Sequence, residues 1–268
     1  MQIYTLASGS GGNCTLVWDG DTAVLIDAGI STKRITNALA EIGILPSQLS
    51  GILITHEHND HIYGLNTFIK HYDIPIFAPR TVANHLCWSI AGVEDYITIL
   101  LPGQDYSINN LKVLPFHTPH DTPESVGYRI SGSSIFGFCT DCGHVTDEVI
   151  EGLSGTNAAV IEANHDLEML QNGSYPVQLK RRILSDNGHL SNDSCGRLAL
   201  ELCKSGTRQI ILGHLSRENN RPSIARSCVL DALSAEGLDI RNNVSVDVAP
   251  ESGTFNLSVK EKVRYAEC

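Results

Sequence analysis

A dense cluster of metal-binding residue types stands at residues 55–61, where the chain reads THEHNDH directly after the apolar run GILI. Side chains two residues apart in an extended loop point the same way, so His56 and His58 can bind one ion. Asp60 and His61, where the chain turns into a helical pattern, can bind another. The spacing therefore predicts two metal ions. The alternative is a polar loop that happens to be rich in histidine, but a solvated loop gains nothing from this order.

This segment resembles the metallo-β-lactamase superfamily, because it matches the signature H-x-H-x-D-H in full. The resemblance implies an α/β fold, the four-layer αββα sandwich of that superfamily. It also implies that His56 and His58 bind the first ion with a third histidine from a later loop. Asp60 and His61 would bind the second ion with a distant histidine, and one further aspartate would bridge the two ions.

Candidates for the remaining ligands occur in the order that the resemblance implies. His120 supplies the third histidine and is preferred over His117 because it sits deeper in its loop. Asp141 follows an apolar strand and can bridge the ions, and His214 ends another strand. A polar residue capping a strand end is the other interpretation of both. Asp27 matches a family position that supports the ligands from behind through hydrogen bonds.

The chemistry expected of such a site is hydrolysis. Two divalent cations about 3.5–4 Å apart can share a bridging hydroxide and hold the oxygens of an in-line displacement. Asp60 would orient that hydroxide and accept its proton. Nitrogen and carboxylate ligands suit Zn²⁺, with Mn²⁺ or iron as alternatives. Two divalent cations bring four positive charges, and the carboxylates of Asp60 and Asp141 neutralise only two of them. The site therefore favours an anionic substrate.

A second histidine motif favours phosphodiester chemistry. The segment GHLSN at residues 188–192 precedes a predicted helix, and it is similar to an element of the ribonuclease Z-like branch that places a histidine beside the scissile phosphate. His189 is therefore expected to protonate the leaving oxygen or to stabilise charge on a non-bridging oxygen. The helix that Ser191 opens adds backbone donors for an anion.

Two further segments are predicted to contact substrate. One is the only three-residue basic run of the chain, which would bind backbone phosphates and whose alternative is a solvated helix face. The other is a glycine-rich loop, whose alternative is an ordinary hairpin. The residues concerned are Lys180, Arg181 and Arg182 in the basic run, and Ser8, Ser10 and Asn13 in the loop.

From residue 3 to about residue 230 the chain resembles the WalJ/YycJ/VicX family, through the segments LASGSxGN, THEHxDH, ExNHD, KRRILSDxGH and HLSxxNN. The resemblance implies a cytoplasmic, dinuclear hydrolase with 5′-to-3′ exonuclease action on DNA ends. His165, in ExNHD, is expected either near the metals or hydrogen-bonded to the helix of the 180s. One alternative is a small-molecule hydrolase acting on a thioester, as in glyoxalase II-like enzymes, or on a cyclic phosphodiester. The other is a non-catalytic, regulatory metal-binding module. The oligomeric state is left open.

The cysteines are expected to be reduced. Eight are scattered through 268 residues, and the first residues lack the pattern of a secretory signal. Cys139 and Cys142 flank Asp141 as C-x-x-C, where the family need not have cysteine. Buried thiols that pack as small hydrophobic groups are favoured there over a redox or metal-recruiting pair.

The elements that must position these residues are short β-branched runs alternating with amphipathic stretches, undivided by a linker or repeat. They predict one α/β domain over 1–268, with two sheets covered on their outer faces and functional groups on loops at strand ends. Strands are predicted at 2–7, 13–18, 22–27, 51–55, 74–78, 97–101, 111–116, 125–131, 133–139, 158–162, 209–212 and 243–247. Helices are predicted at 32–42, 61–72, 79–90, 145–152, 176–185, 191–205 and 221–236.

Composition limits the classes of function. The chain is 42% hydrophobic with a formal charge of −11, which is typical of a globular protein. No apolar run approaches the roughly 20 residues that a membrane helix needs, so we expect no membrane partner and a cytoplasmic location. The acidic balance argues against a broad nucleic-acid-coating surface but not against a local phosphate site.

Overall fold

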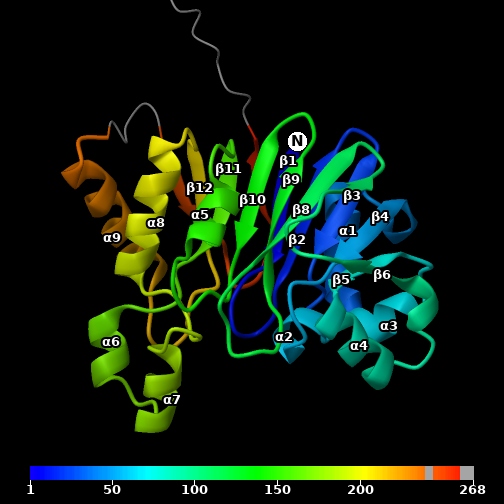
Figure 1. The fold of residues 1–268 in the computed structure, drawn as a ribbon, viewed down its shortest axis with the longest axis horizontal. Coiled ribbons are helices and arrows are strands. Elements are labelled where there is room, and N and C mark those ends of the chain that lie inside the picture. Colours follow the sequence, from blue (N-terminus) through cyan, green and yellow to red (C-terminus); the bar gives the residue numbers. More distant parts are fainter. Residues whose placement is uncertain (239–243, 260–268) are drawn as a thin grey trace, which may run out of the picture.

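Two mixed β-sheets form the centre of the molecule. The computed structural model describes residues 1–238 and 244–259, and within them each sheet has seven strands. The first sheet has the order β14-β1-β2-β3-β4-β5-β6 and the second has the order β13-β12-β11-β10-β9-β8-β7 (Figure 1). The first contains β1 (Gln2–Ala7), β2 (Cys14–Asp19), β3 (Thr22–Ile26), β4 (Leu49–Leu53), β5 (Ile76–Pro79), β6 (Ile97–Leu100) and β14 (Phe255–Ser258). The second contains β7 (Tyr106–Ile108), β8 (Leu111–His117), β9 (Val126–Ser131), β10 (Ile135–Cys139), β11 (Ala158–Glu162), β12 (Gln209–Gly213) and β13 (Ser245–Val248).

Helices cover the outer face of each sheet (Figure 1). The first sheet is covered by α1 (Thr32–Ile42), α3 (Leu65–Ile69) and α4 (Arg80–Ser89), and the second by α5 (Asp147–Leu153), α8 (Asn192–Lys204) and α9 (Pro222–Ala235). The remaining helical segments are α2 (Asn59–Ile62), α6 (Leu167–Asn172), α7 (Val177–Ile183) and the short 3₁₀ turns Pro46–Gln48 and Glu94–Tyr96. The structure thus confirms the predicted four-layer αββα sandwich.

Three apolar layers hold these elements together. The layer between the sheets joins Val24 and Leu53 of the first sheet to Tyr128 and Phe136 of the second, and all four side chains are fully buried. The two other layers lie between each sheet and its helices. Because successive strand side chains alternate between faces, strands of both sheets must be apolar on both sides. This explains the nearly continuous apolar runs in the sequence.

The strand register brings the site-bearing loops to one edge. Strands β3 and β4 run parallel with Ile26 opposite Leu53, so the loops that follow them start side by side. In the second sheet β10, β11 and β12 also run parallel, with Glu162 opposite Gly213. The carboxyl ends of parallel strands meet at the same edge of a sheet, which is where binding groups can face solvent.

The predicted helix over 61–72 is wrong, because the structure has two short helices, α2 and α3, with Gly64 between them. The Gly64 N–H donates to the Ala28 carbonyl at 2.8 Å, and a Cβ at Gly64 would lie only 2.1 Å from the Ile30 carbonyl oxygen. The close approach of the loop after β3 therefore interrupts the helix.

Other differences concern short elements. The sequence did not predict β7, β14 or α6, whose three to six residues carry too few periodic positions to stand out. The strand predicted at 243–247 is present as β13, and residue 243 lies outside the described residues. Among the helices of the described residues, none has the length and apolar character to cross a membrane. That residues 1–268 form one domain stays a prediction.

Tyr128→Phe tests a hydrogen bond that ties the two sheets together. The fully buried Tyr128 hydroxyl donates to the Ile54 carbonyl at 2.5 Å, just before the 55–61 loop. The substitution leaves this carbonyl buried without its donor, so we expect the free energy of unfolding to fall by about 1–3 kcal/mol. Urea unfolding measures it. Tyr4→Phe is the control, because its hydroxyl has no hydrogen bond to the described part of the chain. Equal stability of the two variants would contradict the prediction.

Candidate metal centre

The residues predicted as metal ligands converge from four loop segments at one edge of the two sheets. They come from the segment after β4 and from α2, from the loop after β8, and from the residues that follow β10 and β12. They are His56, His58, Asp60, His61, His120, Asp141 and His214. The structure therefore brings together all seven, although 157 positions of sequence separate the first from the last.

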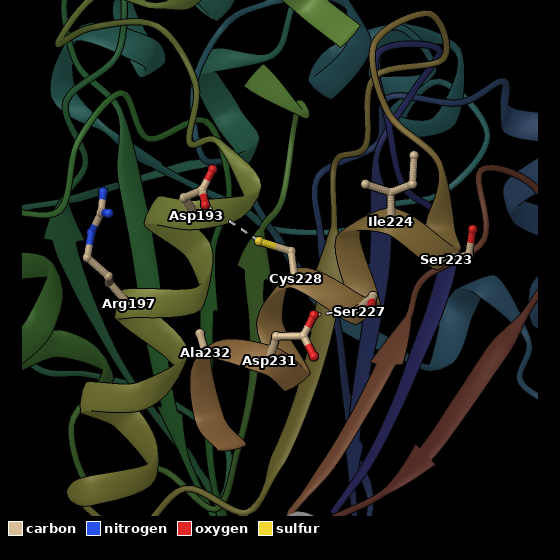
Figure 2. Close-up of a pocket in the computed structure, with 8 residues that line it drawn as sticks. All are labelled: Asp193, Arg197, Ser223, Ile224, Ser227, Cys228, Asp231 and Ala232. Carbon is tan, nitrogen blue, oxygen red and sulfur yellow. Dashed lines mark hydrogen bonds between the residues drawn. The ribbon is translucent and has the colours of Figure 1, made fainter. Parts of the chain in front are cut away.

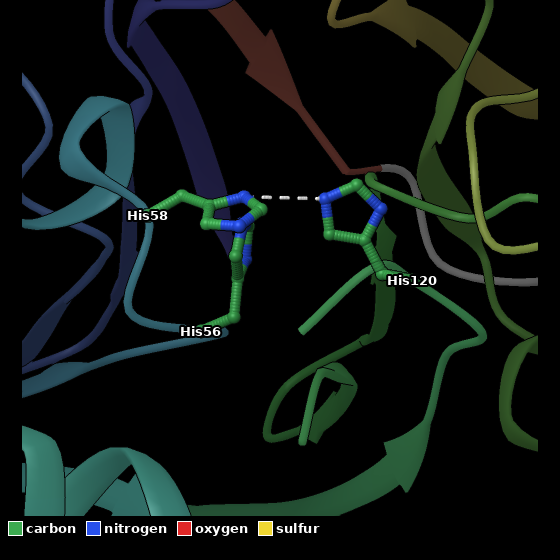
Figure 3. A group of neighbouring side chains, drawn as sticks. All are labelled: His56, His58 and His120. Atoms are coloured by element: carbon green, nitrogen blue, oxygen red, sulfur yellow. Dashed lines mark hydrogen bonds between the residues drawn. The ribbon is translucent and has the colours of Figure 1, made fainter. Parts of the chain in front are cut away.

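One group consists of three histidines. The donor atoms of His56, His58 and His120 lie within 4.8 Å of one another. Nδ1 of His58 is 3.3 Å from Nε2 of His120, and Figure 3 shows these two rings facing each other with His56 beside His58. Two nitrogens bound at 2.0–2.1 Å to one tetrahedral zinc ion are about 3.4 Å apart. The spacing of the rings thus suits a shared ion.

A second group adjoins the first. Asp60, His61 and His214 also have donor atoms within 4.8 Å of one another, and the Asp60 Oδ2 is 3.6 Å from Nε2 of each histidine. The Asp141 carboxylate lies between the groups. Its Oδ2 is 3.3 Å from the His61 Nε2, and its Oδ1 is 3.7 Å from the His120 Nε2. Asp141 therefore occupies the position expected of a bridging ligand.

Unpartnered buried atoms test whether the site fits cations. Nε2 of His56, Nε2 of His214 and Oδ2 of Asp141 are buried and have no hydrogen-bond partner among the described residues. Each such atom costs about 1–3 kcal/mol when left unsatisfied. All three belong to the two groups, and all are atoms with which these residue types bind metals. The donor set therefore fits two divalent cations.

Hydrogen bonds on the side away from the cavity hold the rings of His61 and His56 in place. The Asp27 Oδ2 is 2.8 Å from Nδ1 of His61, and the Thr55 hydroxyl donates to the same carboxylate oxygen at 2.9 Å. The Thr55 oxygen also lies 3.0 Å from Nδ1 of His56. These contacts leave Nε2 of both rings directed at the site. Asp27 thus lies where the sequence placed it, behind the ligands.

The Glu162 carboxylate holds two other rings in place through their Nδ1 atoms. The sequence analysis did not single out this residue. Its Oε1 is 2.8 Å from Nδ1 of His189 and 2.8 Å from Nδ1 of His214. Its Oε2 accepts hydrogen bonds from the N–H groups of Cys142 and Leu190. The signal in the sequence that could have identified Glu162 was a carboxylate at the end of an apolar strand, inside the ExNHD segment; in the structure this strand is fully buried.

The backbone is strained at three of these positions. Asp27, Asp141 and His214 have φ values of 61°, 55° and 55°, in the left-handed region that costs a residue with a side chain roughly 1–2 kcal/mol. Each follows a strand by one or two residues. The left-handed conformation ends the extended course of the strand at a residue whose side chain lies in or behind the site, so the strain accompanies the function.

Opposing charges set the protonation of the site. Although burial opposes it, the carboxylates of Asp141 and Asp27 raise the pKa of His61 to about 10. Asp141 likewise raises the pKa of His214 well above its usual value, against the effect of burial. In turn, His189 and His214 outweigh burial and lower the pKa of Glu162 to about 2. Without cations, protons on His61 and His214 would balance these carboxylates.

The two groups open into a cavity of about 250 Å³. Ser10 and Arg182, which the sequence predicted as substrate contacts, line it together with His189, which the sequence predicted as a catalytic residue. A larger groove of about 720 Å³ lies between α8 and α9, but its lining contains none of the site histidines (Figure 2). The chemistry therefore belongs to the smaller cavity.

Other predicted substrate contacts lie elsewhere. The Ser8 hydroxyl accepts from the His214 N–H at 2.8 Å and so positions that ligand, whereas the Asn13 Nδ2 is 3.0 Å from Nε2 of His61, the nitrogen that faces the site. The Lys180 ammonium donates to two backbone carbonyls at the C-terminal end of α6, and Arg181 is exposed outside the cavity lining. The basic run thus serves two purposes, and only Arg182 faces the site.

The competing residues also have defined places. His117 is exposed and its Nδ1 is 3.1 Å from Glu148, whereas His120 is buried in the site.

Cys139 and Cys142 are fully buried and free, and their mutual hydrogen bond together with burial raises the pKa of Cys139 well above its usual value. They pack as small hydrophobic groups. Seven cysteines are free, and Cys268 lies outside the described residues.

Comparisons with known proteins agree with this geometry. The family model described as the metallo-beta-lactamase superfamily matches residues 7–169. The chain is 35% identical over 259 residues to exodeoxyribonuclease WalJ of Streptococcus pneumoniae strain D39, covering 93% of this chain and 94% of that protein. It is 38% identical over 247 residues to exodeoxyribonuclease YycJ of Bacillus anthracis, covering 90% and 92%. The crystal structure of YhfI from Bacillus subtilis has the same fold, with a TM-score of 0.73 at 15% identity over 95% of this chain and 98% of that one.

His58→Ala tests the division into two groups. The change removes one of three nitrogens from the first group and none from the second. We expect wild-type protein to hold two divalent ions per chain after dialysis and the variant to hold about one, measured by atomic emission. His71→Ala is the control, because the His71 ring is exposed and bound to the Thr67 carbonyl. Two ions retained in His58→Ala would refute the division.

Metal uptake should depend on pH. The raised pKa values of His61 and His214 mean that these rings hold protons at neutral pH until a cation replaces them. We expect proton release on binding and an apparent affinity that rises as the pH is raised from about 6 to about 8, by up to about tenfold per unit for each displaced proton. Competition with a chelating dye, corrected for the dye's own titration, measures this. An affinity independent of pH would show that the rings are already neutral.

Proposed function

Because the chain belongs to the metallo-beta-lactamase superfamily, we propose that it is a metal-dependent exodeoxyribonuclease that shortens DNA from 5′ ends. A metal-dependent hydrolase is what the superfamily and the two groups of donor atoms indicate. DNA as the substrate is supported by identities of 35% and 38% to exodeoxyribonucleases over at least 90% of the chain. The observation that carries the proposal is a histidine–carboxylate pair, His189 and Glu162, beside the metal ligands.

His189 is the proposed proton donor to the leaving oxygen. Its Nδ1 is held by Glu162 at 2.8 Å, so Nε2 is left for a group inside the cavity that His189 lines. Burial opposes protonation, but the Glu162 carboxylate outweighs it and raises the pKa of His189. Cleavage of a phosphodiester needs a proton on the departing oxygen, and an imidazole in this position can supply it.

Asp60 is the proposed proton acceptor. Its side chain is 29% exposed, and it lines the cavity between His61 and His214. It can therefore orient an attacking water molecule and take its proton. Two divalent cations bound at the site would supply Lewis acidity and lower the pKa of water. Nitrogen and carboxylate donors make Zn²⁺ the proposed ion, with Mn²⁺ or iron as alternatives.

Arg182 is the proposed contact for a backbone phosphate. Its guanidinium pairs with Asp121 at the cavity, and the side chain remains 54% exposed. This geometry leaves donors free for an anion. We also propose a cytoplasmic location, which suits the free thiols of the described residues.

His189→Ala tests the role of the proton donor. His189 also lies within a donor group with Asp141, Glu162 and His214, but its Nδ1 is held by Glu162 and neither the three-histidine group nor the Asp60 group includes it, so we expect metal content to stay near the wild-type value. We expect kcat on 5′-labelled duplex DNA to fall by about 10²- to 10⁴-fold, the usual contribution of general acid catalysis. Asp60→Asn should lose activity and also one ion. His71→Ala should retain both.

The same preparations separate the alternative functions. A small-molecule hydrolase would release thiol from a glutathione thioester and leave labelled DNA intact. A metal-binding module without catalysis would do neither while holding both ions. Either result would contradict the proposed function. If His189→Ala degrades labelled DNA as fast as the wild type does, the role of His189 as proton donor is contradicted.

A further inference from the structure

The cavity that the metal ligands line has one wall of a different character from the rest. Metal ligands and other polar side chains make up most of its lining. The apolar side chains of the lining all come from one segment of the chain, α7 and the residues just before it. They are Tyr175, Leu179 and Ile183, and Arg182 lies among them. A substrate that fills this cavity therefore meets an apolar surface as well as the metal centre.

The fold does not account for the apolar side chains of this wall. Neither Tyr175 nor Leu179 packs into one of the three apolar layers of the described chain, and both are half-buried. Within the same described residues, the Tyr175 hydroxyl has no hydrogen-bond partner and its ring lies against no other aromatic ring. The ring thus stays available to a planar group in the cavity.

The C-terminal end of this wall is held against the proposed proton donor. The backbone N–H of His189 donates to the Ile183 carbonyl, the last of α7, at 3.0 Å. Gly188 allows this close approach, because a Cβ there would lie only 2.2 Å from the Ile183 carbonyl oxygen. The wall and the His189 ring therefore have a fixed relation to each other.

The other end of the wall is held by the neighbouring helix, and Figure 1 shows α6 and α7 side by side at the edge of the sheets that carries the site. The Lys180 ammonium of α7 donates to the carbonyls of Gln171 and Gly173 at 2.8 and 2.7 Å. Gly173 in turn lies against Asn219, five residues after the ligand His214, because a Cβ at Gly173 would be 2.5 Å from the Asn219 Oδ1. The Tyr175 ring is thus placed by contacts on both sides of it.

The order of groups along this wall matches the order of groups in a nucleotide. The seven residues of α7 span about 10 Å, so Tyr175 lies roughly that far from the end held at His189. A phosphate at the metal centre would have Arg182 and His189 beside it, and the attached nucleoside would extend along Leu179 towards Tyr175. Stacking on an aromatic ring accepts every base, because each base has a π-face. That is what an exonuclease without sequence preference needs.

We propose that a nucleobase next to the scissile phosphate stacks on Tyr175, with Leu179 packed against the sugar. The inference rests on the proposed nuclease function and names the part of the substrate that the apolar wall recognises. The metal centre and Arg182 bind the phosphate, whereas the wall binds the nucleoside and so favours nucleic acid over a simple phosphodiester. Tyr175 is a substrate contact in this arrangement and has no part in proton transfer.

The test uses three duplexes with the same 5′ end and a 3′ label: one with normal nucleotides and two with an abasic residue at the first or the second position of the degraded strand. Stacking is worth about 1–3 kcal/mol per base, so we expect kcat/KM of the metal-loaded wild type to fall about 5- to 150-fold on at least one abasic duplex. Tyr175→Ala should lose a similar factor on the normal duplex and lose no more on the abasic one. Comparing ratios between enzymes cancels any fraying of the abasic duplex. Tyr175→Phe keeps the ring and should behave as the wild type does.

Val177→Ala is the matched control, because Val177 belongs to the same helix but is 62% exposed and lies outside the cavity lining. Its ratio of normal to abasic cleavage should equal that of the wild type. Metal content and circular dichroism of Tyr175→Ala should also match the wild type. Equal rates of the wild type on all three duplexes, or an unchanged ratio in Tyr175→Ala, would overturn this inference and leave the nuclease function intact. If the wild type degrades none of the duplexes, the proposed function itself fails.

Discussion

The burial of carboxylates against imidazoles at one sheet edge is the constraint on which the rest of the structure depends. Asp27, Asp141 and Glu162 are at most 2% exposed, and a buried charge is tolerated only when it is paired. The surrounding histidines supply that pairing, and the rings of His61 and His214 each have one nitrogen bound from behind and the other facing the site. Cations at the front would replace protons without disturbing the contacts behind. The site is therefore built for exchange between these two kinds of positive charge.

The sandwich holds this arrangement by close contacts between loops. Gly29 lies so near the Asp60 carbonyl that a Cβ would be 1.6 Å from its oxygen, and the Asn13 N–H donates to the same oxygen at 2.8 Å. Across the sheets, the Val126 N–H donates to the Thr55 carbonyl. The ligands thus sit on loops, but these loops are tied to strands of both sheets. Such ties can fix the positions of the ligands before metal binds.

His189 connects the metal centre to the surface around it. Glu162 holds its ring at the cavity that the metal ligands line, and the Ile183 carbonyl at the end of α7 holds its backbone. Positive side chains are few here, in keeping with the formal charge of −11. Arg182 lines this cavity, beside the apolar side chains of the same helix. An acidic protein can offer a polyanion a local site in this way without a broad basic surface.

The sequence by itself determined the elements whose signals are local. The spacing of His56, His58, Asp60 and His61 and the alternation of apolar runs indicated the donor set and the layered α/β fold, because such patterns depend on neighbours in the chain. The resemblance added His120, Asp141 and His214 to the donor set, and only the tertiary structure decided which further distant polar groups meet. It placed Glu162 behind two rings, turned Ser8 and Asn13 towards ligands, used Lys180 to hold backbone carbonyls, and broke a helix at Gly64. These outcomes follow from the packing of one sheet edge against the other, which brings together residues that no sequence spacing connects.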